Sequence, residues 1–370
     1  MPRLRMIKGV PSLRLRPYLS SPPEPLKPSF RIFKTVPLLR NDRYEALVQR
    51  QVVGFVPTMG ALHEGHLALI RQAARETDQV YVSIYVNPTQ FGVNEDLSSY
   101  PQTWPTDYQK LATMEQELSR ENTRGRIHAI FLPNTTTMYP GLPPSSEIEG
   151  DGSFVTITPL AKKLEGASRP VFFRGVATVV MKMLNIVQPE KIYFGQKDVQ
   201  QTFVVKRMVR DFHLNTKVIV APTVREDDGL AMSSRNVYLG ARRRRVALVL
   251  LNALKAVQEV FARGARKRVY LHKAAMEVLT KVQKQQQALP ASQRARFEID
   301  YISIADTETL DELEEVASEH GAIVSGAIKM LPIEEPRPGE ELGIGGDASA
   351  VRLIDNIRLD LLSAKLDFLT

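Results

Sequence analysis

Apolar runs and amphipathic segments alternate between residues 50 and 222. The runs are rich in β-branched and aromatic side chains, which is typical of buried strands, and they lie at 52–56, 79–86, 127–132, 191–194 and 216–220. Apolar residues at helical spacing predict helices at 66–77, at 106–120 and over the string GVATVVMKMLNIV that ends before Pro189. Because alternating strands and helices form a parallel sheet, we expect an α/β fold with a Rossmann-type, doubly wound parallel sheet over residues 29–222.

The pattern changes after residue 222. Apolar spacing predicts two helices, at 241–262 and 267–287, followed by three strands, at 297–306, 321–330 and 349–360. These elements predict a smaller α+β C-terminal domain over residues 223–370. Between the last two strands, a segment rich in proline, glycine and glutamate predicts a flexible surface loop near residues 333–347.

Residues 1–28 differ from the rest of the chain. They carry five basic residues before the first acidic one, Glu24, and then the proline-rich string SSPPEPLKPS. Prolines interrupt any helical periodicity, so we expect a disordered basic extension. An arginine-rich, acid-poor start also suits a mitochondrial transit peptide. We therefore expect a cytoplasmic protein, with the mitochondrion as the alternative compartment.

Composition narrows the chemistry. The 370 residues contain no cysteine, which excludes disulfides, thiolate zinc sites and thiol nucleophiles. No apolar run is long enough to predict a transmembrane helix, so we expect no membrane partner. The net charge of +8 suits anionic partners, but much of the excess lies in the first forty residues and in Arg242–Arg245. We expect that arginine run to begin a solvated helix face, and we expect no nucleic acid to bind.

The most informative string, GFVPTMGALHEGH, runs from Gly54 to His66 at the end of a predicted strand. His63 and His66 are three residues apart, so a helical turn places both on one side. The start of a helix just beyond a strand is a favourable place for phosphate to bind, because free N–H groups and the positive end of the helix dipole meet there. Gly60 and Gly65 let the backbone approach a ligand closely. Two imidazoles at this point can donate hydrogen bonds to a phosphate in the transition state.

The same histidines could instead bind a metal ion. A zinc-protease helix requires the pattern HExxH, with its histidines four residues apart. Here the spacing is three and a glycine intervenes, so phosphate is the favoured ligand and metal the alternative. Asp198 could hold Mg²⁺ or a ribose hydroxyl, and the sequence leaves the metal ligands unknown.

Four strings carry a resemblance to a known family. HEGH resembles the HIGH-type signature of class I adenylyl-transferring enzymes. The fuller strings PTMGALHEGH, YVNPTQF, FGQKDVQQ and REDDGLAMSSRN occur in the same order as in the pantoate–β-alanine ligase (pantothenate synthetase) family, which this chain closely resembles. The terminal string RLIDNIRLD also resembles the last strand of that family. HxGH alone is only moderately specific, whereas the four strings together are strong.

The resemblance implies the positions of the binding and catalytic residues. It assigns ATP binding to Met59, Gly60, Ala61, Leu62, His63, Glu64, Gly65, His66, Gly195, Gln196, Lys197, Asp198, Val224, Met232, Ser233, Ser234 and Arg235. It places pantoate and β-alanine at Asn87, Gln90 and Gln201, whose amides both donate and accept hydrogen bonds. His66 matches the proposed proton donor. We also expect catalytic roles for His63 and for Lys197, whose ammonium can neutralise departing phosphate charge.

The resemblance implies an ATP-dependent condensation of pantoate with β-alanine through a pantoyl-adenylate, with AMP and pyrophosphate released. It further implies a nucleotidyl domain covered by a C-terminal lid domain, Mg²⁺ as cofactor, ATP as a substrate and a homodimer. A nucleotidyltransferase that keeps AMP in its product is one rival, but it would have no use for the glutamine pair. An RNA-binding protein is the other rival, and the chain lacks the aromatic-interleaved strings of such proteins.

Overall fold

The computed structural model describes residues 29–92, 97, 100–141, 151–317, 321–345 and 349–360. The extension expected at residues 1–28 lies outside the described residues. No described helix is long and apolar enough to cross a lipid bilayer.

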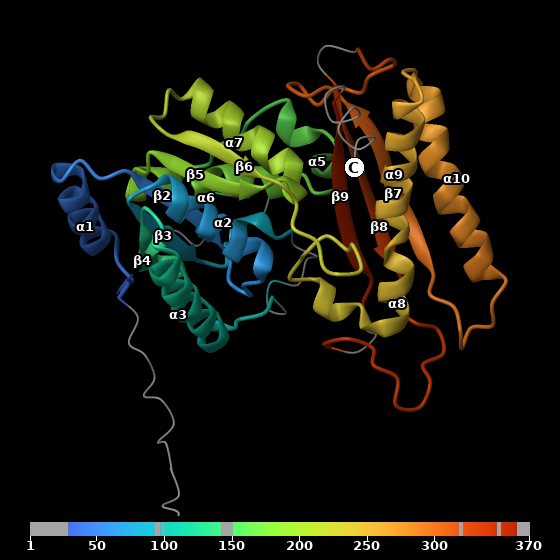
Figure 1. Cartoon of the computed structure of the whole chain (residues 1–370), viewed down its shortest axis with the longest axis horizontal. Helices are drawn as coiled ribbons and strands as arrows, with labels where there is room; N and C mark the ends of the chain where they lie inside the picture. The colour runs from blue at the N-terminus through green and yellow to red at the C-terminus, as the bar shows by residue number, and fades with distance from the viewer. Residues whose placement is uncertain are drawn as a thin grey trace, which may run out of the picture.

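The N-terminal domain contains a six-stranded, entirely parallel sheet (Figure 1). Its strands are β1 (Arg31–Phe33), β2 (Val53–Thr58), β3 (Gln79–Ile84), β4 (Arg126–Phe131), β5 (Lys191–Gly195) and β6 (Lys217–Ala221). The strand order is β1-β4-β3-β2-β5-β6. The chain therefore builds outward from β2 through β3 and β4, then returns to the other side of β2 with β5. The order reverses between β2 and β5, and such a switch point opens a ligand crevice at the carboxyl ends of the strands.

Helices cover both faces of this sheet. They are α1 (Val36–Val48), α2 (Glu64–Glu76), α3 (Trp104–Glu121), α4 (Thr135–Met138), α5 (Glu165–Ser168), α6 (Phe172–Val187) and α7 (Val199–Asp211). Phe55 and Tyr81 point into the core shared with α1, α6 and α7, whereas Val56 and Val82 point into the core shared with α2 and α3. This alternation follows from the period of two along a strand. The expected doubly wound fold is confirmed, although the sequence pattern did not predict β1, α1 or α7.

The C-terminal domain is a three-stranded antiparallel sheet backed by helices. Its elements are α8 (Gly240–Ala247), α9 (Val249–Ala262), α10 (Arg268–Gln287), β7 (Phe297–Ala305), β8 (Ala322–Met330) and β9 (Val351–Leu359), with strand order β7-β8-β9. Leu254 of α9 and Leu279 of α10 pack with Val324 of β8 in one core. Figure 1 shows these helices on the outer side of the sheet and β9 on the side nearest the N-terminal domain. The expected α+β domain is confirmed.

Four short 3-10 turns connect these elements: η1 (Pro88–Gln90), η2 (Leu160–Lys162), η3 (Gln196–Asp198) and η4 (Asn236–Tyr238). The expected boundary between residues 222 and 223 falls one residue beyond β6, and it stays a prediction. The single helix expected at 241–262 is two helices, because the backbone of Leu248 departs from ideal helical geometry, with ψ at −14°.

The expectation that the arginine run is solvated is wrong for Arg242 and Arg243. Arg242 and Arg243 are 6% and 1% exposed. The Arg243 guanidinium donates to the carbonyl oxygens of Leu239 at 2.9 Å and Leu342 at 3.0 Å. Buried guanidinium groups need such acceptors, and backbone carbonyls supply them here.

The loop expected near 333–347 is anchored over its described part. Arg242 pairs with Glu340 through its Nε and Nη2 atoms. The N–H of Ile344 donates to the carbonyl of Val237 at 2.9 Å. The segment therefore packs against α8 and η4 instead of hanging free, and the charges that hold it are the arginines that look solvated in the sequence.

Candidate active site

The turn that follows β2 is shaped by a buried carboxylate on α3. Asp107, which is 1% exposed, accepts the N–H groups of Ala61 at 3.0 Å and Leu62 at 2.8 Å. Gly60 has φ at +87°, which glycine adopts without strain. Lys110, one helical turn along α3, donates to the carbonyl of Leu62. The segment Met59–Leu62 is therefore held in one conformation just before the two histidines.

His63 and His66 lie together at the start of α2. His63 caps the helix, and the two rings contact each other at a tilt of 37°, with centroids 4.1 Å apart. A Cβ atom at Gly65 would lie 2.9 Å from the His63 ring, so glycine lets that ring fold over the helix terminus. Burial lowers the pKa of His63 to about 4, and the charge of Lys197 contributes to this shift. Burial and then the neighbouring His63 lower the pKa of His66 well below its ordinary value. Both rings are neutral at physiological pH.

Lys197 and Asp198 reach the same place from β5. They lie in η3, directly after Gly195, the last residue of β5, and the Lys197 Nζ lies 3.4 Å from Asp198 Oδ1. The ammonium of Lys197 is close enough to lower the pKa of both histidines. The strings HEGH and GQKD, which are far apart in the sequence, therefore meet at the carboxyl ends of the neighbouring strands β2 and β5.

The string after β3 forms a compact amide network. Asn87, 1% exposed, donates to Gln90 Oε1 at 3.1 Å and to the carbonyl of Gly175 at 3.2 Å. Its Oδ1 accepts hydrogen bonds from Tyr139 at 2.7 Å and Thr89 at 3.1 Å. Asn87 lines the cavity, but its polar atoms are committed to this network, so it supports Gln90. The Nε2 of Gln90 lies 3.1 Å from the sulfur of Met59.

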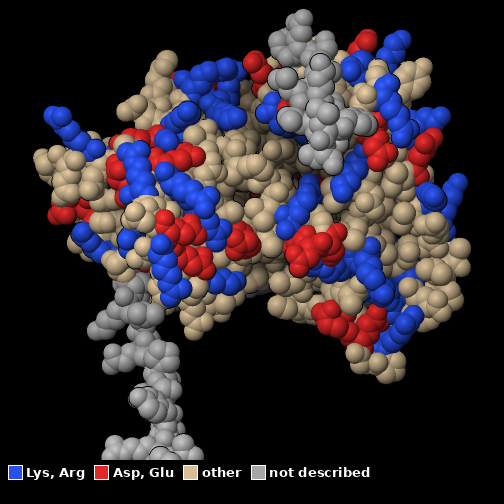
Figure 2. Space-filling view, viewed as in Figure 1, with Lys and Arg blue, Asp and Glu red and all other residues tan. Residues whose placement is uncertain are grey.

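A cavity of about 230 Å³ connects these groups. His63, His66, Asn87, Gln90, Lys197, Asp198, Gln201, Val224 and Met232–Arg235 all line it. The cavity joins a larger one of about 650 Å³ between the two domains, because Lys197, Gln201 and Arg235 border both. The space-filling view is hollowed between the domains, with charges of both signs around the hollow (Figure 2).

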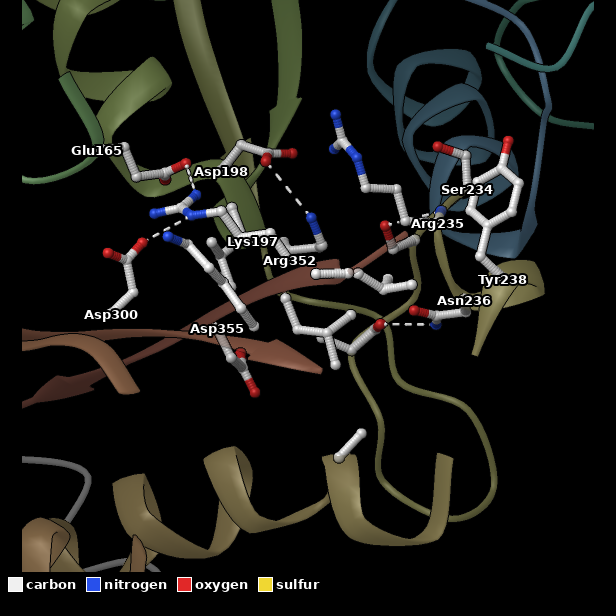
Figure 3. Close-up of a pocket in the computed structure, with 18 of the residues that line it drawn as sticks. Glu165, Lys197, Asp198, Ser234, Arg235, Asn236, Tyr238, Asp300, Arg352 and Asp355 are labelled. Carbon is white, nitrogen blue, oxygen red and sulfur yellow. Dashed lines mark hydrogen bonds and ion pairs between the residues drawn. The ribbon is translucent and has the colours of Figure 1, made fainter. Parts of the chain in front are cut away.

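The loop Met232–Arg235 begins opposite the histidines and is tied at both ends. The N–H of Met232 donates to the carbonyl of Val224 at 3.0 Å. After the loop, the amide of Asn236 donates to Glu226 at 2.6 Å. Between these ties, Ser234 and Arg235 project toward the interdomain cavity (Figure 3). Two hydroxyls and a guanidinium in such a loop can clamp an anion.

An ion-pair group crosses the outer part of the cleft. Arg352 on β9 donates to Glu165 of α5 and to Asp300 of β7, both at 2.8 Å (Figure 3). Because Glu165 belongs to the N-terminal domain, this arginine joins the two domains. Carboxylates on both sides keep the pKa of Arg352 raised despite its burial.

Metal binding has few candidates within the described ranges. No group of three or more His, Asp or Glu side chains there is placed to hold a metal ion. Asp198 borders the cleft with half of its side chain exposed, at 50%. One carboxylate beside a phosphate site is typical of Mg²⁺, which keeps several waters and takes other ligands from substrate phosphates.

The sequence interpretation missed Asp107 and Lys110. They act on a turn about 46 positions earlier in the chain. Charged residues on a helix are ordinary surface features, and Asp107 becomes recognisable only when α3 is seen against the turn. Its spacing from Thr103, whose hydroxyl donates to it at 3.0 Å, is the one local signal available.

Comparisons with known proteins agree with this geometry. The sequence profile described as Pantoate-beta-alanine ligase matches residues 31–358. The pantothenate synthetase of Roseiflexus castenholzii is 49% identical over 278 residues, which make up 75% of this chain and 88% of that protein. The pantothenate synthetase of Thermotoga neapolitana is 44% identical over 286 residues, or 77% and 91% of the two chains.

Solved structures agree as well. The pantothenate synthetase of Thermus thermophilus has a TM-score of 0.69 at 39% identity, and the match covers 90% of this chain and 100% of that one. The pantoate-β-alanine ligase of Francisella tularensis, complexed with Beta-gamma ATP and β-alanine, has a TM-score of 0.57 at 29% identity and covers 89% and 97%. The profile and the relatives span most of the chain, and so this protein belongs to the pantoate–β-alanine ligase family.

Proposed function

We propose that the chain condenses pantoate with β-alanine at the cost of ATP, through a pantoyl-adenylate, releasing AMP and pyrophosphate. The observation that carries this proposal is the meeting of two histidines and Lys197 at the strand-order switch, beside a cavity lined by Gln90 and Gln201. The first group suits nucleotide phosphates. The second suits a small substrate that bears hydroxyls and a carboxylate. The Francisella complex supports ATP and β-alanine as substrates.

The first step transfers AMP to pantoate. A carboxylate oxygen of pantoate attacks the α-phosphorus of ATP, the bond to the bridging oxygen breaks, and pyrophosphate leaves with the electron pair. A neutral His66 donates a hydrogen bond to the α-phosphate oxygens, where charge accumulates. The ammonium of Lys197 lies beside the departing pyrophosphate, and Arg235 of the loop closes over it.

The second step forms the amide. The neutral amine of β-alanine attacks the acyl carbon, the bond to the AMP oxygen breaks, and the amine proton passes to solvent. Gln90 and Gln201 keep the acyl group beside the incoming amine, which converts an encounter between two molecules into a local event. The domains enclose the adenylate, because water would hydrolyse it.

We propose Mg²⁺ as the cofactor, and Asp198 would hold it together with ATP phosphates and waters. When bound, Mg²⁺ neutralises phosphate charge. We expect no zinc at His63 and His66. Elemental analysis that finds one zinc per chain would contradict the phosphate assignment of the two histidines.

We also propose a homodimer in solution. Several large apolar side chains are exposed on β1 and α1, namely Ile32, Leu38, Tyr44, Leu47 and Val48, and exposed apolar groups gathered in this way favour association. Light scattering at micromolar concentration checks this, and a monomeric mass would contradict it.

The test of the proposed function is an assay with ATP, Mg²⁺, pantoate and β-alanine. We expect pantothenate, AMP and pyrophosphate in equal amounts. ADP and phosphate would indicate phosphorylation of the carboxylate instead. A product that retains AMP in the presence of β-alanine would favour the nucleotidyltransferase.

A further inference from the structure

Asn356, in the middle of β9, contacts the nucleotide loop from the other domain. Its side chain is buried, at 2% exposed. The Nδ2 donates to two consecutive carbonyls, those of Gln196 and Lys197, each at 2.9 Å. Its Oδ1 accepts from the side chain of Gln196 at 3.2 Å. One carboxamide therefore holds the two peptides that flank Lys197, one before it and one after it.

The preceding residue holds the second phosphate-binding segment. Asp355 pairs with both arms of Arg225, at 2.7 and 3.1 Å, and also accepts the backbone N–H of Asn356 at 2.8 Å. Arg225 forms a β-bridge with Ala231, immediately before the loop Met232–Arg235. Two adjacent residues of β9 thus fix the bases of η3 and of the anion-clamping loop.

The placement of Lys197 depends on this grip. Lys197 lies in a short 3-10 turn between β5 and α7, and its ammonium must reach past Asp198 toward the two histidines. A shift of about 1 Å in a positioning contact costs roughly a hundredfold in rate. Hydrogen bonds to the carbonyls of residues 196 and 197 restrict the rotation of the two peptides that flank Lys197. Because Asn356 belongs to the C-terminal domain, the correct placement of Lys197 requires that domain to be docked.

We propose that Asn356 is a positioning residue for adenylate formation, which holds Lys197 against the nucleotide phosphates when the C-terminal domain is docked. This inference rests on the proposed function. It makes the C-terminal domain part of the machinery for the first step, and it gives that domain no part in the attack by β-alanine.

A purely structural tie between the domains is the alternative, and the chain supplies two controls. Lys163 joins the same domains, donating to Asp311 and to the Thr309 carbonyl, each at 2.6 Å. Ser325 lies opposite Asn356 in the β8–β9 register, and its buried hydroxyl has no hydrogen-bond partner among the described residues. Lys163→Met removes a domain contact and Ser325→Ala removes a buried polar group, while neither touches η3.

The experiment measures the two half-reactions separately by rapid quench. Enzyme mixed with ATP, Mg²⁺ and pantoate reports pyrophosphate formation, and enzyme loaded with adenylate and then mixed with β-alanine reports the second step. For Asn356→Ala we expect pyrophosphate formation to slow by about 10- to 100-fold, with the second step changed less than about threefold. Asn356→Ser, which keeps one donor, should fall between Asn356→Ala and the natural enzyme. Both controls should match the natural enzyme.

A double variant tests whether Asn356 acts through Lys197. If it does, Lys197→Met with Asn356→Ala should form adenylate no more slowly than Lys197→Met alone. The inference would be overturned if the losses in rate of the two single variants multiplied in the double variant, or if Asn356→Ala slowed both half-reactions equally. It would also be overturned if Asn356→Ala formed adenylate at the natural rate, or if Lys163→Met slowed this step as much as Asn356→Ala does. If Asn356→Ala does not fold, the same comparisons apply to Asn356→Ser. A natural enzyme that forms no pyrophosphate would refute the proposed function itself, and the inference with it.

Discussion

The backbone N–H of His63 points at Nδ1 of His66, with 3.4 Å between the two nitrogens. An imidazole nitrogen that accepts a hydrogen bond carries no proton, so the single proton of a neutral His66 lies on Nε2. Because burial keeps the pKa of this ring far below its usual range, the neutral form persists at physiological pH. Burial thus sets the charge of His66, and the short turn between the two histidines sets its tautomer.

The low pKa of His63 predicts a pH-dependent loss of stability. Unfolded His63 takes up a proton below pH 6.5, whereas the folded form stays neutral down to about 4. The unfolded state binds more protons in this window, so stability falls as the pH falls through it. Between pH 7 and pH 5 this group should remove up to about 2 kcal/mol from the free energy of unfolding.

Urea unfolding of the natural protein and of His63→Gln measures this contribution. The variant should lose less stability between pH 7 and pH 5, by up to about 2 kcal/mol. A comparison at pH 8, where both forms of residue 63 are neutral, corrects for the general effect of the substitution. Equal losses in the two proteins would show that His63 titrates normally in the folded state.

The tautomer of His66 predicts which substitutions at this position retain more activity. His66→Ala should lower kcat by about a hundredfold or more, because a missing transition-state donor costs about 3–4 kcal/mol, while ATP binding changes much less. Glutamine places an amide N–H near the former Nε2, whereas asparagine places it near Nδ1. We therefore expect His66→Gln to retain more activity than His66→Asn in steady-state assays. The reverse order would assign the catalytic proton to Nδ1.

Much of the site could be predicted from the sequence because its parts are local. The string around His63 and His66 is continuous, and each of the other motifs begins within a few residues of the end of a strand. In a parallel sheet, strand ends gather at one edge, so motifs after strands converge without further information. The six-stranded order did not have to be known for Lys197 to be placed near the histidines.

The remaining features depend on contacts between distant segments. Thr103 is the one local signal at Asp107, and it does not indicate that Asp107 accepts two N–H groups of the turn at Ala61 and Leu62. The burial of Arg243 depends on carbonyls about a hundred positions away, such as that of Leu342. An arginine run is usually solvated, and the folded path of the later segment adds acceptors to the local carbonyl of Leu239, which makes burial favourable.

Removal of the Asp107 carboxylate should raise the KM for ATP, whereas removal of the Glu115 carboxylate on the same helix should not. Asp107→Ala leaves two N–H groups of the turn without an acceptor, at about 1–3 kcal/mol each, and the turn should relax. We expect the KM for ATP to rise about tenfold or more, since roughly 1.4 kcal/mol corresponds to a factor of ten. Glu115, on the same helix, accepts the N–H of Ile127 at 2.9 Å, away from the cavity. Glu115→Ala should lower the melting temperature without changing the KM for ATP, and equal KM changes would contradict a specific role for Asp107.

Two adjacent glutamines on α7 have different expected roles, Gln201 in substrate binding and Gln200 in packing. Gln201 lines the cavity, as does Gln90, whereas Gln200 is buried and donates to the carbonyl of Leu160 at 2.9 Å. Gln90→Ala should raise the KM for pantoate and β-alanine, Gln201→Ala should raise that for pantoate, and both should leave ATP binding nearly intact. Gln200→Ala should reduce stability with little change in either KM. Calorimetry that shows weakened ATP and normal pantoate binding in Gln90→Ala would mean that the two pockets are exchanged.

The order of chemistry gives the last prediction. Pantoate held by Gln90 and Gln201 lies beside the histidines, so its carboxylate can reach the α-phosphorus before any amine is present. His66 and Lys197 then stabilise the charge that moves onto pyrophosphate, and the enclosed cavity protects the adenylate from water. Enzyme, ATP, Mg²⁺ and pantoate alone should therefore release pyrophosphate in a burst of about one equivalent per active site. Addition of β-alanine should convert the bound adenylate into pantothenate and AMP.

Single-turnover quench with labelled ATP follows each species, and it separates this sequence from direct condensation in a ternary complex. Pyrophosphate that appears only after β-alanine arrives would establish direct condensation, and it would refute both the adenylate sequence and the role proposed for Asn356 in it.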